Sequence, residues 1–288
     1  MKGILVLILN ILFPGNRVVE IGENAMTDNA NPCFRKIIHL LQYVSLSAVI
    51  LAVWQMASNL GYIKPLILPP PSQVAMTFWD LLQSGAMARH VGISVLRVME
   101  GFAIAAVLGL GLGIAIGLSR TLDRMSDLII QVVKPIPPIA WIPLAILWFG
   151  IGEESKVYII FLGAFFPIII NTIDGIRQTD HKLVEVARIM EVPRFKFVRQ
   201  VVIPGAFPAI MTGIRVGLMV AWMCVVAAEL IAASSGIGYL IMDARQLSQS
   251  DVVLVGMITI GVIGKLMDSL IKLLEQRLIG WKVSYAGE

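Results

Sequence analysis

Three long runs of the chain contain no charged side chain: Gly101–Leu118, Ile136–Gly152 and Val157–Ile173. A helix needs about 17–25 predominantly apolar residues to cross a bilayer, and each run has roughly that length. Charged residues make up only 15% of the whole chain, against about 25% in an average soluble domain. The runs therefore exclude a soluble enzyme, a disordered chain and a secreted disulfide scaffold. They predict an all-α integral membrane protein.

Hydropathy predicts six transmembrane helices, at Ile38–Leu60, Gly101–Leu118, Ile136–Gly152, Val157–Ile173, Phe207–Ala232 and Val252–Leu274. An even number of spans places both termini on the same side of the membrane. If that side is the cytoplasm, most of the 23 Lys and Arg lie inside and only five outside: Lys64, Arg89, Arg97, Lys156 and Arg245. Cytoplasmic loops carry the excess of basic residues in membrane proteins, so we expect both termini to be cytoplasmic. The basic charge then indicates contact with anionic membrane lipid and not with nucleic acid.

The predicted domain organisation is an N-terminal cytoplasmic segment, 1–36, a single transmembrane domain, 37–280, and a C-terminal tail, 281–288. The apolar run Ile4–Phe13 is too short to span a bilayer, and no signal-peptide cleavage site follows it. We expect Met26 to be the natural start and residues 1–25 to be an upstream extension. Mass spectrometry that finds Met1 at the native N-terminus would contradict this expectation.

Small residues recur on one face of two predicted spans. Helices can approach closely along such a face, because a glycine places no side chain between their backbones. The stripes predict either a face that lines a pathway or a dimer, or ordinary packing inside one subunit. The glycines concerned are Gly101, Gly109, Gly113, Gly117, Gly213 and Gly217.

Prolines interrupt the start of the third span. Irregular backbone at membrane depth must be buried in protein or line a wet cavity. A helix that restarts after Pro138 presents free N–H groups and a positive dipole end, which suit an anionic solute. Pro138, Trp141 and Trp148 of this stretch are therefore candidates for a translocation pathway, and a simple proline kink is the alternative.

A second proline cluster, Pro69–Pro71, predicts an external loop. Ser72 follows it and has the side chain of a helix N-cap. We expect a short helix over Gln73–Leu82, capped by Ser72 and lying on the membrane surface.

Two ionisable side chains, Arg215 and Glu229, lie inside the fifth span. They are roughly 21 Å apart along one helix, so they cannot pair with each other. Charges in a membrane by default mark a pathway or a pair, and both residues are pathway candidates. Arg215 is expected to snorkel or to pair with another helix, and Glu229 to lie near the outer interface. Lys265 and Asp268 have the spacing of a helical ion pair.

The loop between the fourth and fifth spans contains an amphipathic helix. Leu183, Val186, Ala187 and Met190 recur at helical spacing, and Pro193 ends the pattern. The apolar face of such a helix has two possible uses, which the sequence leaves open. It can lie on the protein's own spans, or it can enter a groove on another protein.

The same loop carries the resemblance to a known family. Glu185-Val186-Ala187 followed by Ile203-Pro204 resembles the E-A-A…G…I-x-L-P coupling motif of the importer permeases of the ABC transporter superfamily. Val186 replaces the usual Ala, and Glu191 replaces the Gly that begins the turn between two short helices. Further stretches match in the same order along the chain. Together they resemble the nitrate/sulfonate/taurine branch, and most closely its taurine and aliphatic-sulfonate permeases. These stretches are 68–71, 137–144, 148–152, 212–217, 226–230 and 235–238.

The resemblance implies a permease of the bacterial inner membrane and not an enzyme. A second copy of the chain would complete one pathway, and two cytoplasmic ABC ATPase subunits would bind ATP and Mg²⁺. Residues Glu185, Val186, Ala187, Glu191, Pro193, Ile203 and Pro204 would form the ATPase-coupling element. A solute-binding protein would deliver a small anion, taken to be a sulfonate or taurine, with nitrate, bicarbonate or a pyrimidine precursor as alternatives.

Two other classes of protein compete with this interpretation. An ATPase-independent secondary transporter predicts inverted repeats or several acids at the midplane of the membrane, and the sequence shows neither. A membrane-embedded enzyme predicts a catalytic or metal-binding cluster. His39, His90 and His181 are scattered instead, so no catalytic residue and no metal ligand is predicted.

Overall fold

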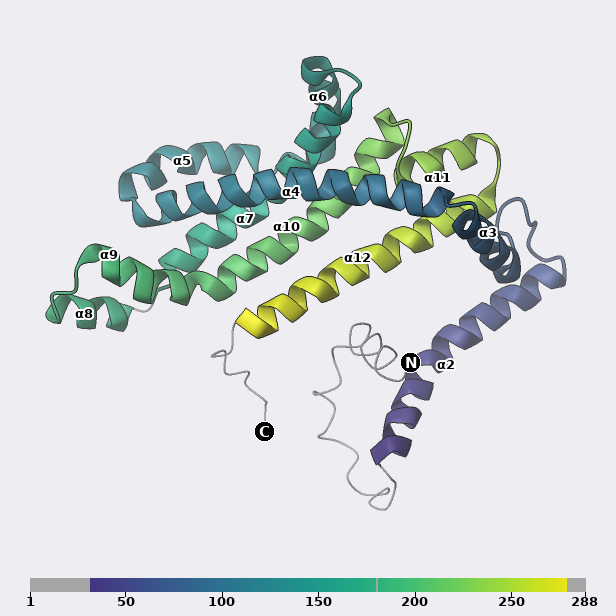
Figure 1. Cartoon of the computed structure of the whole chain (residues 1–288), viewed down its shortest axis with the longest axis horizontal. Helices are drawn as coiled ribbons and strands as arrows, with labels where there is room; N and C mark the ends of the chain where they lie inside the picture. The colour runs from purple at the N-terminus through teal and green to yellow at the C-terminus, as the bar shows by residue number, and fades with distance from the viewer. Residues whose placement is uncertain (1–31, 180, 279–288) are drawn as a thin grey trace. The chain divides into compact units, whose positions relative to one another are not determined.

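The computed structural model describes residues 32–179 and 181–278, and within them the chain folds into helices without strands. The expected start at Met26, the segment 1–25 and the tail 281–288 lie outside the described residues. The helices are labelled in Figure 1. They are α2 (Pro32–Asn59), α3 (Pro71–Gln83), α4 (Ala86–Leu118), α5 (Arg120–Val133), the 3₁₀ turn η1 (Pro138–Trp141), α6 (Ile142–Phe149), α7 (Glu153–Arg177), α8 (His181–Ile189), α9 (Arg194–Phe197), the π-helical turn η2 (Val198–Val202), α10 (Ile203–Ala232), α11 (Ile237–Gln246) and α12 (Ser250–Leu278).

Four stretches of helix are long and apolar enough to cross a membrane: α4, α7, the continuous run from α9 to α10, and α12. A fifth arises if α5 is joined to η1 and α6, across a bend of 86°. The prolines predicted to interrupt this span lie at the bend, and α6 alone is too short to cross a bilayer. The first predicted span overlaps α2, which is not among these candidates. The all-helical membrane fold is confirmed, and the count of six spans is not.

The helices group into two compact units. One contains α2, α3 and residues 240–260, and the other contains residues 88–239 and 261–278. In the first unit, the Thr77 hydroxyl donates a hydrogen bond of 2.7 Å to the Asp251 carboxylate, which ties α3 to the beginning of α12. Ser72 does not cap α3. The helix begins at Pro71, two residues before the expected start at Gln73, because proline is well suited to the first helical position. The Ser72 N–H donates instead to the Gln55 side chain, at 3.1 Å.

The core of the second unit is formed by α4, α7 and α10, which all contact one another. A Cβ added to Gly101 would lie 2.7 Å from Ile160, and one added to Gly113 would lie 2.7 Å from Thr172. The backbone of α4 therefore runs against α7 at a distance that only glycine permits. Gly109 and Gly117 lie against α7 in the same way.

The glycines of α10 face an adjoining side of α7, and Ile168 lies against both Gly109 of α4 and Gly217 of α10. A Cβ on Gly213 would lie 2.7 Å from Asn171, and one on Gly217 would lie 2.9 Å from Ile168. From one α4 glycine to the next, the residue number of the α7 residue that it contacts increases. From Gly213 to Gly217 of α10, the residue number of the contacted α7 residue decreases. Thus α4 and α7 are parallel, and α10 is antiparallel to both. Because α4 and α7 point the same way, α7 begins on the side of this core from which α4 comes. The segment between them, α5 to α6, must therefore bring the chain back from the far end of α4.

Candidate functional site

Three polar side chains project from one face of α4, in its N-terminal half. His90, Ser94 and Arg97 are spaced by four and three residues, so they lie one above the other. They bind the connection between α10 and α11. The backbone N–H of Gly236 donates to His90 Nδ1 at 3.1 Å, and that of Ile237 donates to Ser94 Oγ at 2.9 Å. This face of α4 therefore fixes the path of the chain after α10.

Arg97 is the centre of a buried ion-pair network. Its Nε and Nη2 donate to the two Glu153 oxygens, at 2.5 and 2.7 Å. Its Nη1 donates to Glu229 at 2.8 Å and to the Ser235 carbonyl at 2.7 Å, and Nη2 also donates to the Ser235 hydroxyl at 3.1 Å. A guanidinium has five N–H donors, and these five contacts use all of them.

Glu229 is enclosed on every side. Its carboxylate accepts from Ser94 Oγ at 2.8 Å and from the Gly238 N–H at 2.9 Å, in addition to Arg97. Only 1% of the residue is exposed, so its charge is compensated inside the protein and not by solvent. A buried carboxylate needs both a cation and hydrogen-bond donors. The sequence could not show these partners, because they come from α4 and from the turn after α10.

Glu153 and Lys156 complete the network at the beginning of α7. Lys156 Nζ lies 2.9 Å from Glu153 Oε1, and the Lys156 side chain is only 5% exposed. We refer to Arg97, Glu153, Lys156 and Glu229 as the Arg97 cluster. Of its four members, the sequence identified only Glu229 as a candidate functional residue. The cluster contains two cations and two carboxylates.

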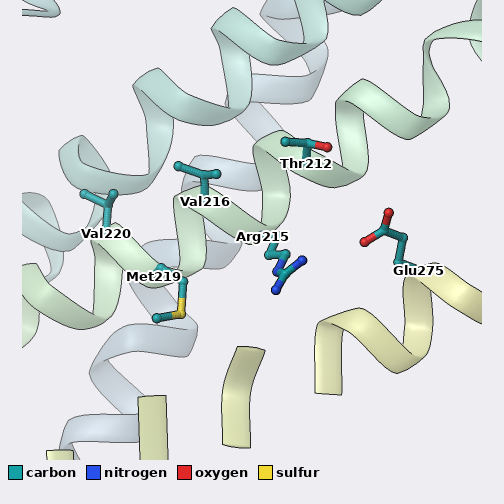
Figure 2. A pocket seen from close by; sticks show the side chains of 6 residues that line it. All are labelled: Thr212, Arg215, Val216, Met219, Val220 and Glu275. Carbon is teal, nitrogen blue, oxygen red and sulfur yellow. The ribbon is translucent and has the colours of Figure 1, made fainter. Parts of the chain in front are cut away.

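Arg215 belongs to a separate ion pair. Its Nε and Nη2 donate to the two Asp268 oxygens on α12, at 2.6 and 3.0 Å. Asp268 therefore does not depend on Lys265 for its partner, because the planar guanidinium fork can bind both oxygens at once. The pair lies beside a hollow of about 390 Å³ lined by Thr212, Arg215, Val216, Met219, Val220 and Glu275. Figure 2 shows the Arg215 side chain extending from α10 toward α12, with Glu275 on the α12 side.

The other predicted pathway residues lie at the helix break. Pro138 begins η1 and is half-buried, and Trp141 packs on a core cluster that includes Ile142 and Cys224. Trp148 is 54% exposed and makes an edge contact with Tyr158. The structure does not bring these residues together with Arg215 or Glu229 in one site. Among residues 32–179 and 181–278, it also contains no group of three or more metal-ligating side chains.

The predicted coupling segment forms a short helix, α8, followed by a tight turn. The Val192 N–H donates to the Ala187 carbonyl at 3.0 Å, which is the long hydrogen bond of a Schellman motif. Glu191 occupies the left-handed position of this motif, with φ of +49°. The turn that the resemblance places at a glycine is thus formed with glutamate. Pro193 caps α9, and Ile203 and Pro204 begin α10.

The left-handed backbone at Glu191 predicts a stabilising substitution. A non-glycine residue in this conformation costs about 1 kcal/mol, which glycine avoids. We expect Glu191→Gly to stabilise the turn by a few tenths to about 1 kcal/mol, since the greater freedom of the unfolded chain offsets part of the gain. Amide hydrogen exchange should show slower exchange at Val192. Glu185→Gly, in the middle of α8, serves as the control and is expected to accelerate exchange; slower exchange in both variants, or in neither, would contradict the prediction.

The comparisons with known proteins agree with the resemblance seen in the sequence. Residues 105–280 match the family model of the binding-protein-dependent transport system inner membrane component. The chain is 46% identical to the putative aliphatic sulfonates transport permease protein SsuC of Bacillus subtilis, over 84% of this chain and 88% of that protein. It is 37% identical to the taurine transport system permease protein TauC of Escherichia coli, over 81% and 86% of the two chains.

A solved structure shares the fold. An inward-facing form of the MetNI methionine ABC transporter aligns with a TM-score of 0.54 at 18% identity, and covers 67% of this chain and 97% of that one. The fold, the family model and the identity to SsuC agree. The chain therefore belongs to the family of binding-protein-dependent transport system inner membrane components, the importer permeases that its sequence resembles.

Proposed function

We propose that this permease carries a small organic sulfonate across the bacterial inner membrane. The observation that supports the proposal most strongly is the similarity to SsuC, which extends over 84% of the chain. SsuC and TauC are named for aliphatic sulfonates and for taurine. Both kinds of solute carry a sulfonate group. The shared chemistry of the solute is therefore a small oxyanion with three equivalent oxygens.

The proposed assembly contains two copies of this chain, two cytoplasmic ATPase subunits and a solute-binding protein outside. Both termini lie in the cytoplasm, α2 supplies the first of six spans, and the bent α5–α6 segment supplies the third. The parallel directions of α4 and α7 support this topology, because the segment between them has to cross back. ATP and Mg²⁺ bind to the ATPase subunits.

The exposure of α8 supports its role as the contact with the ATPase. Leu183 is 50% exposed, Val186 51% and Met190 70%. The apolar face therefore does not pack on the protein's own spans, which was one of its two possible uses. An exposed apolar face on a short helix fits a groove on a partner protein. Closure of the ATPase pair would then draw the two α8 helices together and switch the permease between its inward and outward states.

Uptake by the reconstituted transporter tests the choice of solute. Proteoliposomes that contain the permease, its ATPases and the binding protein are loaded with ATP, and uptake of labelled taurine, ethanesulfonate, nitrate and bicarbonate is compared. The proposal expects ATP-dependent uptake of the sulfonates. Preference for nitrate or bicarbonate would contradict the sulfonate assignment, and equal uptake without the ATPases would contradict the class of transporter.

Replacing Ile189 with aspartate is expected to uncouple the permease from its ATPase. The change places a charge on the most exposed apolar side chain of α8, and an unpaired charge in an apolar interface costs several kcal/mol. Co-purification of the ATPase with I189D should fall at least about tenfold, while the yield of folded permease is unchanged. Tyr62→Asp is the matched control, since Tyr62 is 83% exposed in the loop after α2. Equal co-purification of the ATPase with I189D and Y62D would refute the role of α8.

A further inference from the structure

We infer that the edge of Arg97 now occupied by the Glu153 carboxylate is a binding site for a small, singly charged oxyanion, and that Glu153 is its displaceable internal occupant. This inference rests on the proposed function and deepens it. It assigns the solute a contact in the permease itself. In the topology proposed above, the site lies toward the extracytoplasmic end, where the binding protein releases its solute.

The two carboxylates that bind Arg97 differ in accessibility. The Glu229 side chain is 0% exposed, whereas the Glu153 side chain is 58% exposed on the same 4%-exposed Arg97. Glu229 therefore acts as a permanent counter-ion. Glu153 is the first residue of α7, and its side chain can rotate into solvent without breaking a hydrogen bond of the helix.

Without Glu153, the cluster would have one uncompensated positive charge. Arg97 and Lys156 would then face only Glu229, and both cations are at least 95% buried. Buried cations require an anionic partner. A singly charged oxyanion restores neutrality, whereas a neutral solute does not.

The donors already have the geometry that an oxyanion requires. The Nε and Nη2 edge of Arg97 binds two oxygens of one group, and a guanidinium fork binds sulfonate-like and carboxylate oxygens in the same bidentate way. Glu153 Oε1 receives both Arg97 Nη2, at 2.7 Å, and Lys156 Nζ, at 2.9 Å. An oxyanion in place of this carboxylate would thus meet three N–H donors.

Another arginine pair of this unit has the opposite arrangement. In the Arg215–Asp268 pair the carboxylate is the more buried member, at 19% exposure against 37% for the arginine. An incoming anion would have to displace the less accessible partner. The exchange that we infer for Arg97 therefore has no equivalent there. Competition from Glu153 would also keep solute binding weak, which suits a site that must release what it binds.

The test is the affinity of the intact permease–ATPase complex for ethanesulfonate. The complex, in lipid nanodiscs without the binding protein, is titrated calorimetrically with sodium ethanesulfonate, with sodium chloride holding the ionic strength constant. Glu153→Gln is expected to lower the Kd for ethanesulfonate about tenfold or more, because it removes the competing charge but keeps the shape of the side chain. Glu154→Gln is the matched control: Glu154 is the exposed neighbour of Glu153 in the first turn of α7, and its Kd is expected to equal that of the wild type.

Two further arms identify the donors and the charge requirement. Lys156→Gln added to E153Q should reverse the gain in affinity, and ethyl methyl sulfone, an uncharged sulfonyl compound, should not bind. If E153Q fails to assemble, Glu153→Asp replaces it, and its shorter reach to Arg97 should give a smaller gain. Equal Kd values for the Glu153 variant and E154Q, or equal binding of the sulfone, would overturn the site.

Uptake of ethanesulfonate by the wild-type transporter is measured in parallel. Absence of uptake would contradict the proposed function. Uptake together with equal Kd values for the Glu153 variant and E154Q would contradict only the oxyanion site.

Discussion

Replacing Arg97 with methionine is expected to destabilise the permease by about 3–5 kcal/mol, the cost of removing one partner of a buried ion pair. The substitution leaves the Glu229 carboxylate, which is 0% exposed, without its cation. It also leaves the Ser235 carbonyl without its 2.7 Å donor. The measurement is the temperature at which half of the detergent-solubilised protein remains monodisperse, and R97M should lose most of its monodisperse fraction well below the wild type.

Two controls separate the ion pair from a general effect of losing an arginine. Arg245→Met removes an exposed arginine and should change stability by no more than about 0.5 kcal/mol. The double variant R97M/E229Q removes both charges and should recover much of the loss, since a buried pair replaced as a whole often costs little. Equal stability of R97M and R245M would contradict a structural role for the pair. Additive losses in the double variant would show that the two charges are not coupled.

Replacing Gly236 with alanine is expected to cost about 3 kcal/mol or more, from two independent causes. The first is the backbone, because Gly236 has φ of +112°, where side chains are strongly disfavoured. The second is space, because an added Cβ would collide with the Glu229 carboxylate. That carboxylate cannot move aside without giving up its bonds to Ser94, Arg97 and Gly238. The same monodispersity assay measures the loss.

Gly150→Ala isolates the contribution of the collision. Gly150 also has a positive φ, +75°, but an added Cβ there would meet no atom within 4 Å. Its substitution should cost about 1–3 kcal/mol, from backbone strain alone. If G236A is no less stable than G150A, Glu229 is not fixed in the way its hydrogen bonds indicate.

Local features of the sequence predicted most of the fold. The uncharged runs correspond to α4, α7 and the region around α6, because length and absence of charge suffice to identify a membrane helix. The bend before α6 was predictable from Pro135, Pro137 and Pro138, since proline removes a backbone donor. The boundary of α3 was not, because Pro71 suits the first helical position better than Ser72 suits the cap.

The Arg97 cluster could not be predicted in the same way, because its members come from distant parts of the chain. Arg97 meets residues 56 and 132 positions away, so no local window contains the partners. One signal was available: His90, Ser94 and Arg97 share one face of a helix. The pairing of Asp268 with Arg215 was missed for a related reason. Sequence spacing favours a neighbour on the same helix, whereas Arg215 reaches Asp268 from α10 with a bidentate fork.

The balance of charge in the Arg97 cluster has an electrical consequence. Its two cations and two carboxylates sum to zero, so a motion that carries all four together does no net work against the membrane voltage. Moving a single unpaired charge across the membrane would instead cost or release about 2.3 kcal/mol per 100 mV of membrane potential. The voltage therefore acts on the solute and not on this part of the protein. Any current that accompanies a transport cycle would report the charge of the transported ion.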